Sequence, residues 1–451
     1  MTDCNAKPLH FSSLGRKKIQ ADFDGGRLTS DTGTLLLREV DQQMGLVHAL
    51  ADCIPDPRHP SLIQHSQEEM LAQRIYSIAL GYEDLNDHDA LRRDPALQVA
   101  TERIRKEDED QALSSPSTLC RLENRISRES LTRIAKVFVE QFIASHEEPP
   151  EEIILDFDAT DDPLHGHQEK RFFHGYYDCY CYLPLYVFCG DQLLVAYLRP
   201  SGIDVAKHSR AILMMLVRRF REVWPKVRIV FRGDSGFCRW RLMRWCEKND
   251  VSYIIGLARN PVLEGLADFW IREAKLNYIV LGEKQRIFNT FRYAAKTWDK
   301  RRRVIVKAEH LEKGSNTRFI VTNLKGSSMD LYDNVYCQRG DMENRIKEQQ
   351  LGLFADRTSC HSFLANQFRL FLSAAAYVLM ESIRRLVLKG TELSRAQVHT
   401  IRIKLFKIAS RVTKSVRRIV FHMATGYPYQ KLFSKIVNTL RAQPQVDTSY
   451  R

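Results

Sequence analysis

Hydrophobic residues in the N-terminal third of the chain recur at helical spacing. After the capping box Ser66-Gln67-Glu68-Glu69, apolar side chains return every three or four residues up to Gly81. A second such stretch follows Pro116, with Leu119, Leu122 and Ile126 on one face. We therefore predict a helical N-terminal region over residues 1–150. If the two helices form a helix-turn-helix, this region binds DNA; an ordinary helical pair is the alternative.

From residue 151 the pattern changes to short strands that alternate with helices. Apolar runs predict strands at 153–158, 182–189, 193–198, 227–231 and 252–257, and amphipathic runs predict helices at 205–223 and 239–248. This order predicts an α/β fold with a mixed sheet. Strand-like basic segments within 260–332 indicate a β-rich insertion, and a helix is predicted from about 333 to 353.

The net charge indicates what kind of partner the protein binds. The formal charge of the 451 residues is +13, and residues 381–451 hold 15 Lys and Arg against three acids, so this segment carries +12. A local surplus of this size favours contact with the phosphate backbone of a nucleic acid. A solvated basic tail is the alternative.

Composition also indicates the compartment. The N-terminus lacks the apolar centre of a signal peptide, and the apolar stretch 370–380 is too short to span a bilayer, so it predicts a core helix. Ten scattered cysteines without a Cys-x-x-Cys pair favour reduced thiols over disulfides or structural zinc. We expect a cytoplasmic protein that does not enter a membrane.

Candidate chemistry begins at the end of the first predicted strand, where Asp156 and Asp158 share a face. Carboxylates crowded there repel each other, and a divalent cation relieves the repulsion. A polar turn after the strand is the alternative interpretation. Asp234 follows the fourth strand, and Glu343 lies on the predicted 333–353 helix, on one face with Tyr336 and Arg339.

In this order the motifs resemble the DDE transposases of bacterial insertion sequences, in the group 1 DDE-domain branch (the IS thirteen-eighty family). The resemblance covers at least Asp156 to Ser359. It rests on Leu-Asp-Phe-Asp-Ala-Thr-Asp-Asp, His-Gly-His-Gln-Glu-Lys-Arg-Phe-Phe-His-Gly-Tyr-Tyr, Arg-Gly-Asp-Ser-Gly-Phe and Tyr-x-x-Arg-Gly-x-x-Glu. It implies a ribonuclease H-like catalytic core over 151–259, interrupted by the insertion 260–332, completed by 333–380 and followed by the basic C-terminal region 381–451.

The resemblance also implies roles for single residues. Asp158, Asp234 and Glu343 would be the catalytic metal ligands, with Asp156 as the alternative first acid. They would hold two Mg2+ ions about 4 Å apart, with Mn2+ expected to substitute. Tyr336, Arg339 and Lys347 would bind DNA phosphates. The lysine position of the family signature is occupied by Gln350, and Lys347, one turn earlier, would replace it in part.

The expected activity is DNA transposition. The protein would bind the terminal inverted repeats of its element as double-stranded DNA, cleave the ends and transfer the 3′ ends to target DNA, as a homodimer or larger assembly in the nucleoid. A metal-dependent nuclease without strand transfer and a catalytically silent DNA-binding derivative are the alternatives. His165, His167 and His174 offer a zinc or manganese hydrolase site as a further alternative, and Trp298 offers stacking on an extruded base.

Overall fold

The computed structural model describes residues 8–103 and 112–442 and divides the chain into two compact units. Unit 1 combines Met1–Arg125 with Ala375–Arg451, and unit 2 comprises Ile126–Ala374. The chain therefore begins unit 1, builds unit 2 and then returns to complete unit 1.

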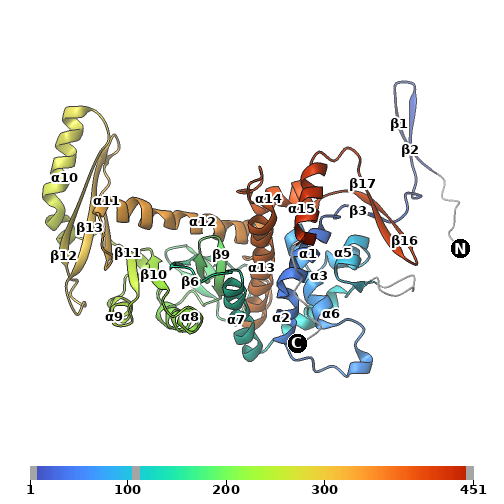
Figure 1. The fold of residues 1–451 in the computed structure, drawn as a ribbon, viewed down its shortest axis with the longest axis horizontal. Helices are drawn as coiled ribbons and strands as arrows, with labels where there is room; N and C mark the ends of the chain where they lie inside the picture. The colour runs from blue at the N-terminus through green and yellow to red at the C-terminus, as the bar shows by residue number, and fades with distance from the viewer. Residues whose placement is uncertain (1–7, 104–111, 443–451) are drawn as a thin grey trace. The chain divides into compact units, whose positions relative to one another are not determined.

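A mixed sheet of nine strands forms the centre of unit 2 (Figure 1). Its order is β12-β13-β15-β11-β10-β4-β8-β9, with β14 paired to β13. The strands are β4 (Glu152–Ala159), β8 (Leu185–Cys189), β9 (Gln192–Tyr197), β10 (Arg228–Gly233), β11 (Ser252–Leu257), β12 (Gln285–Tyr293), β13 (Arg302–Leu311), β14 (Gly314–Ser315) and β15 (Arg318–Thr322). β10 runs parallel to both β4 and β11, and the other pairs are antiparallel. The predicted mixed α/β sheet is confirmed.

Helices cover both faces of this sheet, because alternate strand residues point to opposite sides. On one face, Phe231 of β10 belongs to a core with residues of α7 (Arg128–Ala144), α8 (Ser209–Val223), α9 (Trp240–Lys248) and α10 (Pro261–Leu281). On the other face, Val230 packs with Leu331 and Tyr332. The central strands are buried from both sides, which explains why they read as nearly continuous apolar runs.

The helix predicted from 333 to 353 is confirmed, but its winding changes along its length. α11 (Ser328–Asp330) continues into a π-helical stretch (Leu331–Tyr336), a 3-10 turn (Cys337–Arg339), α12 (Gly340–Lys347) and a second π-helical stretch (Glu348–Gly352). Such π-helical turns often accompany functional sites. This helical segment, residues 328–352, carries Tyr336, Arg339 and Glu343.

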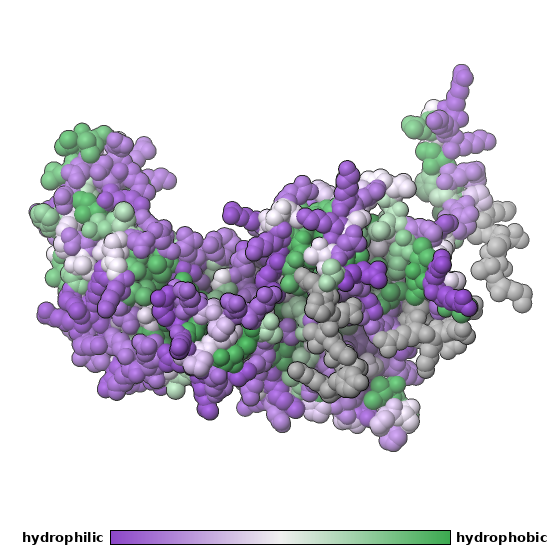
Figure 2. Space-filling model, viewed as in Figure 1, coloured by the Kyte–Doolittle hydropathy of each residue, from purple (hydrophilic) through white to green (hydrophobic). Residues whose placement is uncertain are grey.

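Residues 260–332 differ in two ways from the strand-like pattern of the sequence. They begin with the 21-residue helix α10, which we did not predict, and their strands extend the main sheet beyond β11. α10 is apolar on more than one side: Leu263 is buried, whereas Phe269 and Val280 are 71% and 80% exposed. Figure 2 shows hydrophobic residues gathered at this end of the unit. An apolar surface on several sides blurs helical periodicity, which explains the missed helix.

Unit 1 is mainly helical and contains α1 (Thr34–Met44), α2 (Leu46–Asp52), α3 (Gln67–Leu80), α4 (His88–Leu91), α5 (Pro95–Ala100), α6 (Pro116–Asn124), α14 (Val398–Ile401) and α15 (Gln430–Ala442). The predicted capping box is present, since the Ser66 hydroxyl accepts the Glu69 N–H at 3.0 Å. α4 and α5 lie between the two predicted helices α3 and α6, so the interpretation of this pair as a helix-turn-helix is wrong.

Two small β structures complete unit 1. β1 (Leu9–Leu14) and β2 (Lys17–Ala21) form an exposed hairpin, and β17 (Arg418–Met423), β16 (Ser410–Ser415) and β3 (Leu28–Thr29) form a three-stranded sheet. The N-terminal strand β3 thus pairs with a strand from the C-terminal part of the chain, which closes the unit.

The apolar stretch around 370–380 forms the centre of α13 (Phe363–Ile383). The helical region Phe363–Leu388 is long and apolar enough to cross a membrane, but 89% of its apolar window is buried inside the protein. Such burial is typical of a core helix, as predicted.

Candidate active site

Two of the predicted acids meet at the ends of adjacent parallel strands. β4 and β10 pair in parallel with Phe157 opposite Gly233, so Asp158 and Asp234 follow side by side. The Asp234 carboxylate accepts the Gly236 N–H at 2.9 Å and thereby caps the turn after β10. The fold therefore brings together two carboxylates that lie 76 positions apart in the sequence.

Arg339 connects the third acid to this pair. Its Nη1 donates to Asp158 Oδ2 at 3.0 Å, and its Nη2 donates to Glu343 Oε1 at 2.6 Å. Burial lowers the pKa of Arg339, but the neighbouring Asp158 and Glu343 outweigh it and hold that pKa above its usual value. In this structure the guanidinium lies between the acids, where we had expected it to face a DNA phosphate.

The electrostatics of Asp158 reflect this crowding. Burial raises the pKa of Asp158 to about 7, although Arg339 opposes the shift; the negative charges of Asp234 and Glu343 add to it. Ionisation of the Asp158 carboxyl group therefore costs free energy in this buried position, even with Arg339 beside it. This is the environment that a metal ion stabilises.

Asp156, the alternative first acid, has a different partner. Arg232, opposite it on β10, donates from Nε and Nη2 to its two carboxylate oxygens, the latter at 2.6 Å. Burial raises the pKa of Asp156, although the Arg232 guanidinium opposes this shift. Arg232 also donates to the carbonyl of Val335. The pair therefore ties β4 and β10 to the helical segment 328–352, and both oxygens of Asp156 are occupied.

The Tyr336 hydroxyl lies beside Gly256 of β11. A Cβ atom added to Gly256 would stand 2.5 Å from the Tyr336 hydroxyl and 2.8 Å from the backbone nitrogen of Ser235. The backbone of β11 therefore passes close to both Tyr336 and the residue after Asp234. Burial raises the pKa of Tyr336.

Sequence reasoning missed Gly256 and Arg232 as supports of the site. A glycine inside a β-branched strand signals close backbone approach, and an arginine at the end of an apolar strand requires a buried partner. Both signals are present in the sequence, but neither identifies the partner.

The other predicted phosphate ligands lie further along the helix. Lys347 is exposed, one turn after Glu343 on α12. Gln350, which occupies the lysine position of the family signature, donates from Nε2 to the carbonyl of Asp161 at 2.9 Å. The amide thus anchors the helix to the loop after β4 and contributes no charge.

The histidines and Trp298 have local surroundings of their own. His165 and His167 are exposed, and His174 lies against the Tyr177 ring at 4.9 Å on β6 (Phe172–His174). The partly buried Trp298 packs against the core of unit 2 and makes an edge contact with Tyr293 at 5.6 Å. Neither contact indicates a ligand.

The residues present fit a divalent metal by chemistry, because carboxylate oxygens are the donors that Mg2+ prefers. Across residues 8–103 and 112–442, however, no three His, Cys, Asp or Glu side chains are grouped closely enough to hold an ion as they stand. Arg339 accounts for this at the acids, because it fills the space between Asp158 and Glu343. Within the same residues, no such group forms around His165, His167 and His174 either.

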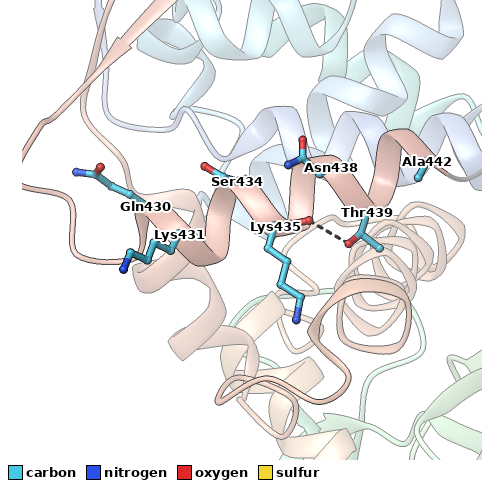
Figure 3. Close-up of a pocket in the computed structure, with 7 residues that line it drawn as sticks. All are labelled: Gln430, Lys431, Ser434, Lys435, Asn438, Thr439 and Ala442. Carbon is cyan, nitrogen blue, oxygen red and sulfur yellow. Dashed lines mark hydrogen bonds between the residues drawn. The ribbon is translucent and has the colours of Figure 1, made fainter.

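A separate hollow of about 910 Å³ runs along α15 in unit 1 (Figure 3). It is lined by Gln430, Lys431, Ser434, Lys435, Asn438, Thr439 and Ala442. Figure 3 shows Lys431 and Lys435 extending to the same side of the helix. Since the lining holds two ammonium groups and no carboxylate, this hollow suits an anion and does not belong to the acidic site.

Comparisons with known proteins identify the family. A cryo-EM structure of a piggyBac transposase synaptic complex with hairpin DNA aligns over 94% of this chain and 84% of its own, with 11% identity and a TM-score of 0.42, which is too distant to carry an argument. A search of curated proteins gives no match. The family described as transposase DDE domain group 1 matches residues 11–445, nearly the whole chain. This protein therefore belongs to the transposase DDE domain group 1 family.

Proposed function

We propose that this protein is a DDE transposase that binds the terminal inverted repeats of its insertion sequence, cleaves the DNA ends and transfers the 3′ ends to target DNA. The observation that carries the proposal is the meeting of Asp158 and Asp234 at adjacent parallel strand ends, with Glu343 joined to Asp158 through Arg339. Family membership supports the same activity. The motifs quoted above favour the bacterial IS thirteen-eighty branch.

The fold we infer for residues 151–259 and 333–380 is a ribonuclease H-like core. The strand order β9-β8-β4-β10-β11, with three central parallel strands and an antiparallel pair at one side, supports it. Residues 260–332 are then an insertion that extends the sheet, and residues 381–451 are the basic C-terminal region. We infer DNA binding for the helices of region 1–150 that lie in unit 1, because its last helix, α7, packs in the core of unit 2.

Asp158, Asp234 and Glu343 would hold two Mg2+ ions, or Mn2+ in their place. When bound, these ions activate the attacking water or 3′-hydroxyl and stabilise the leaving oxygen. We leave Asp156 out of the ligand set because a buried guanidinium, that of Arg232, binds both of its carboxylate oxygens, whereas Asp158 accepts one N–H from Arg339 and one from the backbone of Ala159.

The chain's own residues would position the DNA. Arg339, once it leaves the acids, can donate two parallel N–H groups to a phosphate. Tyr336 supplies a hydroxyl beside Asp234, and the exposed Lys347 supplies a second cation one turn after Glu343. Two DNA ends must be joined in one complex, so we infer a homodimer or larger assembly on DNA, in the nucleoid of the cytoplasm.

The test uses labelled DNA that carries the flanking repeats, incubated with the full-length protein and Mg2+. Asp234→Asn and Glu343→Gln are expected to slow cleavage at least about a hundredfold. The matched control is Asp268→Asn on α10, an acid with a half-exposed side chain that pairs only with Arg272 among the described residues. If both variants cleave the DNA as fast as the wild type, Asp234 and Glu343 are not catalytic residues.

The products separate the alternatives. Joining of the freed 3′ ends to a target duplex identifies a transposase, whereas cleavage without joining identifies a metal-dependent nuclease. Binding without cleavage by the wild-type protein identifies a catalytically silent derivative.

A further inference from the structure

The basic surplus of residues 381–451 is divided between two roles. Some of its cations hold unit 1 together: Arg402 is buried and donates to the carbonyl of Ala79 at 2.9 Å, and Lys407 pairs with Asp31 at 2.6 Å. These side chains are committed to the fold. The question is therefore which cations remain for a polyanionic partner.

The hairpin β16–β17 carries a group of cations that face solvent. Residues 410–423 include three arginines, Arg411, Arg417 and Arg418, together with Lys414, and no acid. All four are exposed, and in the described chain no acidic side chain forms an ion pair with any of the three arginines. Figure 1 shows the hairpin extending away from the helices of unit 1.

The register of the hairpin sorts its residues onto two faces. Arg411 pairs with His422, Thr413 with Val420 and Ser415 with Arg418. Residues two apart along a strand share a face, so these six residues form one surface, which we call the polar face. Val416 and Arg417 form the turn, and the Val416 side chain is 89% exposed. The polar face thus combines two arginines with hydroxyl and imidazole groups around one apolar residue, Val420, and Val416 stands at its tip.

We propose that the hairpin β16–β17 enters the major groove of duplex DNA with its polar face toward the base edges. Two paired strands lie about 5 Å apart, and the major groove, about 12 Å wide, admits a two-stranded ribbon. Arginine donates two parallel hydrogen bonds to guanine O6 and N7, and serine or threonine pairs with several bases. The inference rests on the proposed function in one respect: it takes the terminal-repeat DNA as the partner.

The test measures binding of the full-length protein to a terminal-repeat duplex in EDTA, over a range of salt concentrations. The double variant Arg411→Ala/Arg418→Ala, which removes both arginines of the polar face, is expected to bind at least about tenfold more weakly, and its binding should depend less steeply on salt. The matched control, Arg218→Ala/Arg272→Ala, removes the same charge from exposed helix positions in unit 2, where the side chains are 84% and 76% exposed. It is expected to bind like the wild type.

A chemical footprint tests the groove. The wild-type protein is expected to protect guanine N7 atoms, which lie in the major groove, and the double variant is expected to lose part of this protection. Unchanged affinity of the double variant overturns the inference, as does an equal loss in the control or lost affinity with full N7 protection. Equally tight binding to an RNA duplex of the same sequence also overturns it, because the A-form major groove is too narrow to be read.

These outcomes are independent of the cleavage test. Because binding is measured without metal, hairpin-dependent binding by a protein that never cleaves DNA supports this inference and contradicts the proposed function. Normal cleavage by a protein whose DNA binding does not depend on the hairpin supports the proposed function and contradicts this inference.

Discussion

Asp158 titrates near neutrality, and this has a consequence for stability. Its pKa rises from 3.8 to about 7 in the folded chain, first because the side chain is buried. The folded state therefore holds the proton more tightly than the unfolded state, and stability falls as the pH rises from about 4 to about 7. Above that range the full cost of the charge is present.

We predict that Asp158→Asn stabilises the metal-free protein at pH 8. The amide keeps the shape of the side chain without its charge, so the free energy of unfolding should rise by about 1–3 kcal/mol at pH 8 and change little at pH 4. Urea denaturation at both pH values measures the effect, with Asp268→Asn as the control. Lower stability of Asp158→Asn at pH 8 would show that the pair with Arg339 outweighs the cost of burial.

Gly256 gives a second prediction for a single residue. Gly256→Ala places a methyl group against the Tyr336 hydroxyl and the Ser235 backbone, and the backbone cannot move aside. We expect a loss of about 1–3 kcal/mol in the free energy of unfolding. Gly265→Ala is the matched control, since no atom lies within 4 Å of its added Cβ and alanine favours the helix α10.

Urea denaturation compares the two glycine variants. Tyr336→Phe should recover part of the loss caused by Gly256→Ala, because it removes the nearest of the two clashing atoms. A neutral Gly256→Ala would show that β11 and Tyr336 are further apart than described.

At the scale of elements, the Asp156–Arg232 pair joins three segments: β4, β10 and the helical segment 328–352. Both side chains are buried, with exposed fractions of 2% and 6%. Removal of one partner leaves a buried charge without compensation. We predict that Arg232→Met lowers the free energy of unfolding by about 3–5 kcal/mol.

A double variant separates charge from packing. Asp156→Leu/Arg232→Met removes both charges and should recover most of the loss, since apolar replacements of a buried pair are often neutral. Thermal and urea unfolding measure both variants. If the double variant is as unstable as Arg232→Met, the hydrogen bond to Val335 and not the ion pair holds the helical segment.

Most elements near the site could be predicted from local pattern. β11 begins and ends where the apolar run predicts, and Arg339 and Glu343, which their spacing places on one helix face, form an ion pair. The choice between Asp156 and Asp158 could not be made from the sequence, because both lie on one face and the partner that distinguishes them, Arg232, lies 76 residues after Asp156. α10 was missed because its apolar residues do not keep to one side.

At the scale of the whole molecule, the sequence predicts a basic C-terminal region. It does not predict which of its cations stabilise the fold and which remain exposed. Whether a given cation is exposed depends on partners from the other end of the chain, such as Asp31 for Lys407. Such pairs arise because unit 1 is built from both ends of the chain, and no local pattern records them.

The discontinuous unit 1 gives the last prediction. Lys407 is the ionic partner of Asp31, whose buried carboxylate otherwise receives neutral donors from Ser30 and Tyr82. We predict that Lys407→Met destabilises unit 1 by about 2–4 kcal/mol and leaves unit 2 unaffected. Hydrogen exchange read by mass spectrometry should show lost protection in α1 and α3 but not in β4 and β10. The matched control, Lys300→Met, removes an exposed lysine from Glu247 in unit 2, which keeps its pair with Arg302, and should cost no more than about 1 kcal/mol. Equal loss of protection in both units would show that they unfold together, whereas selective loss would show that the returning segment stabilises the unit in which the chain begins.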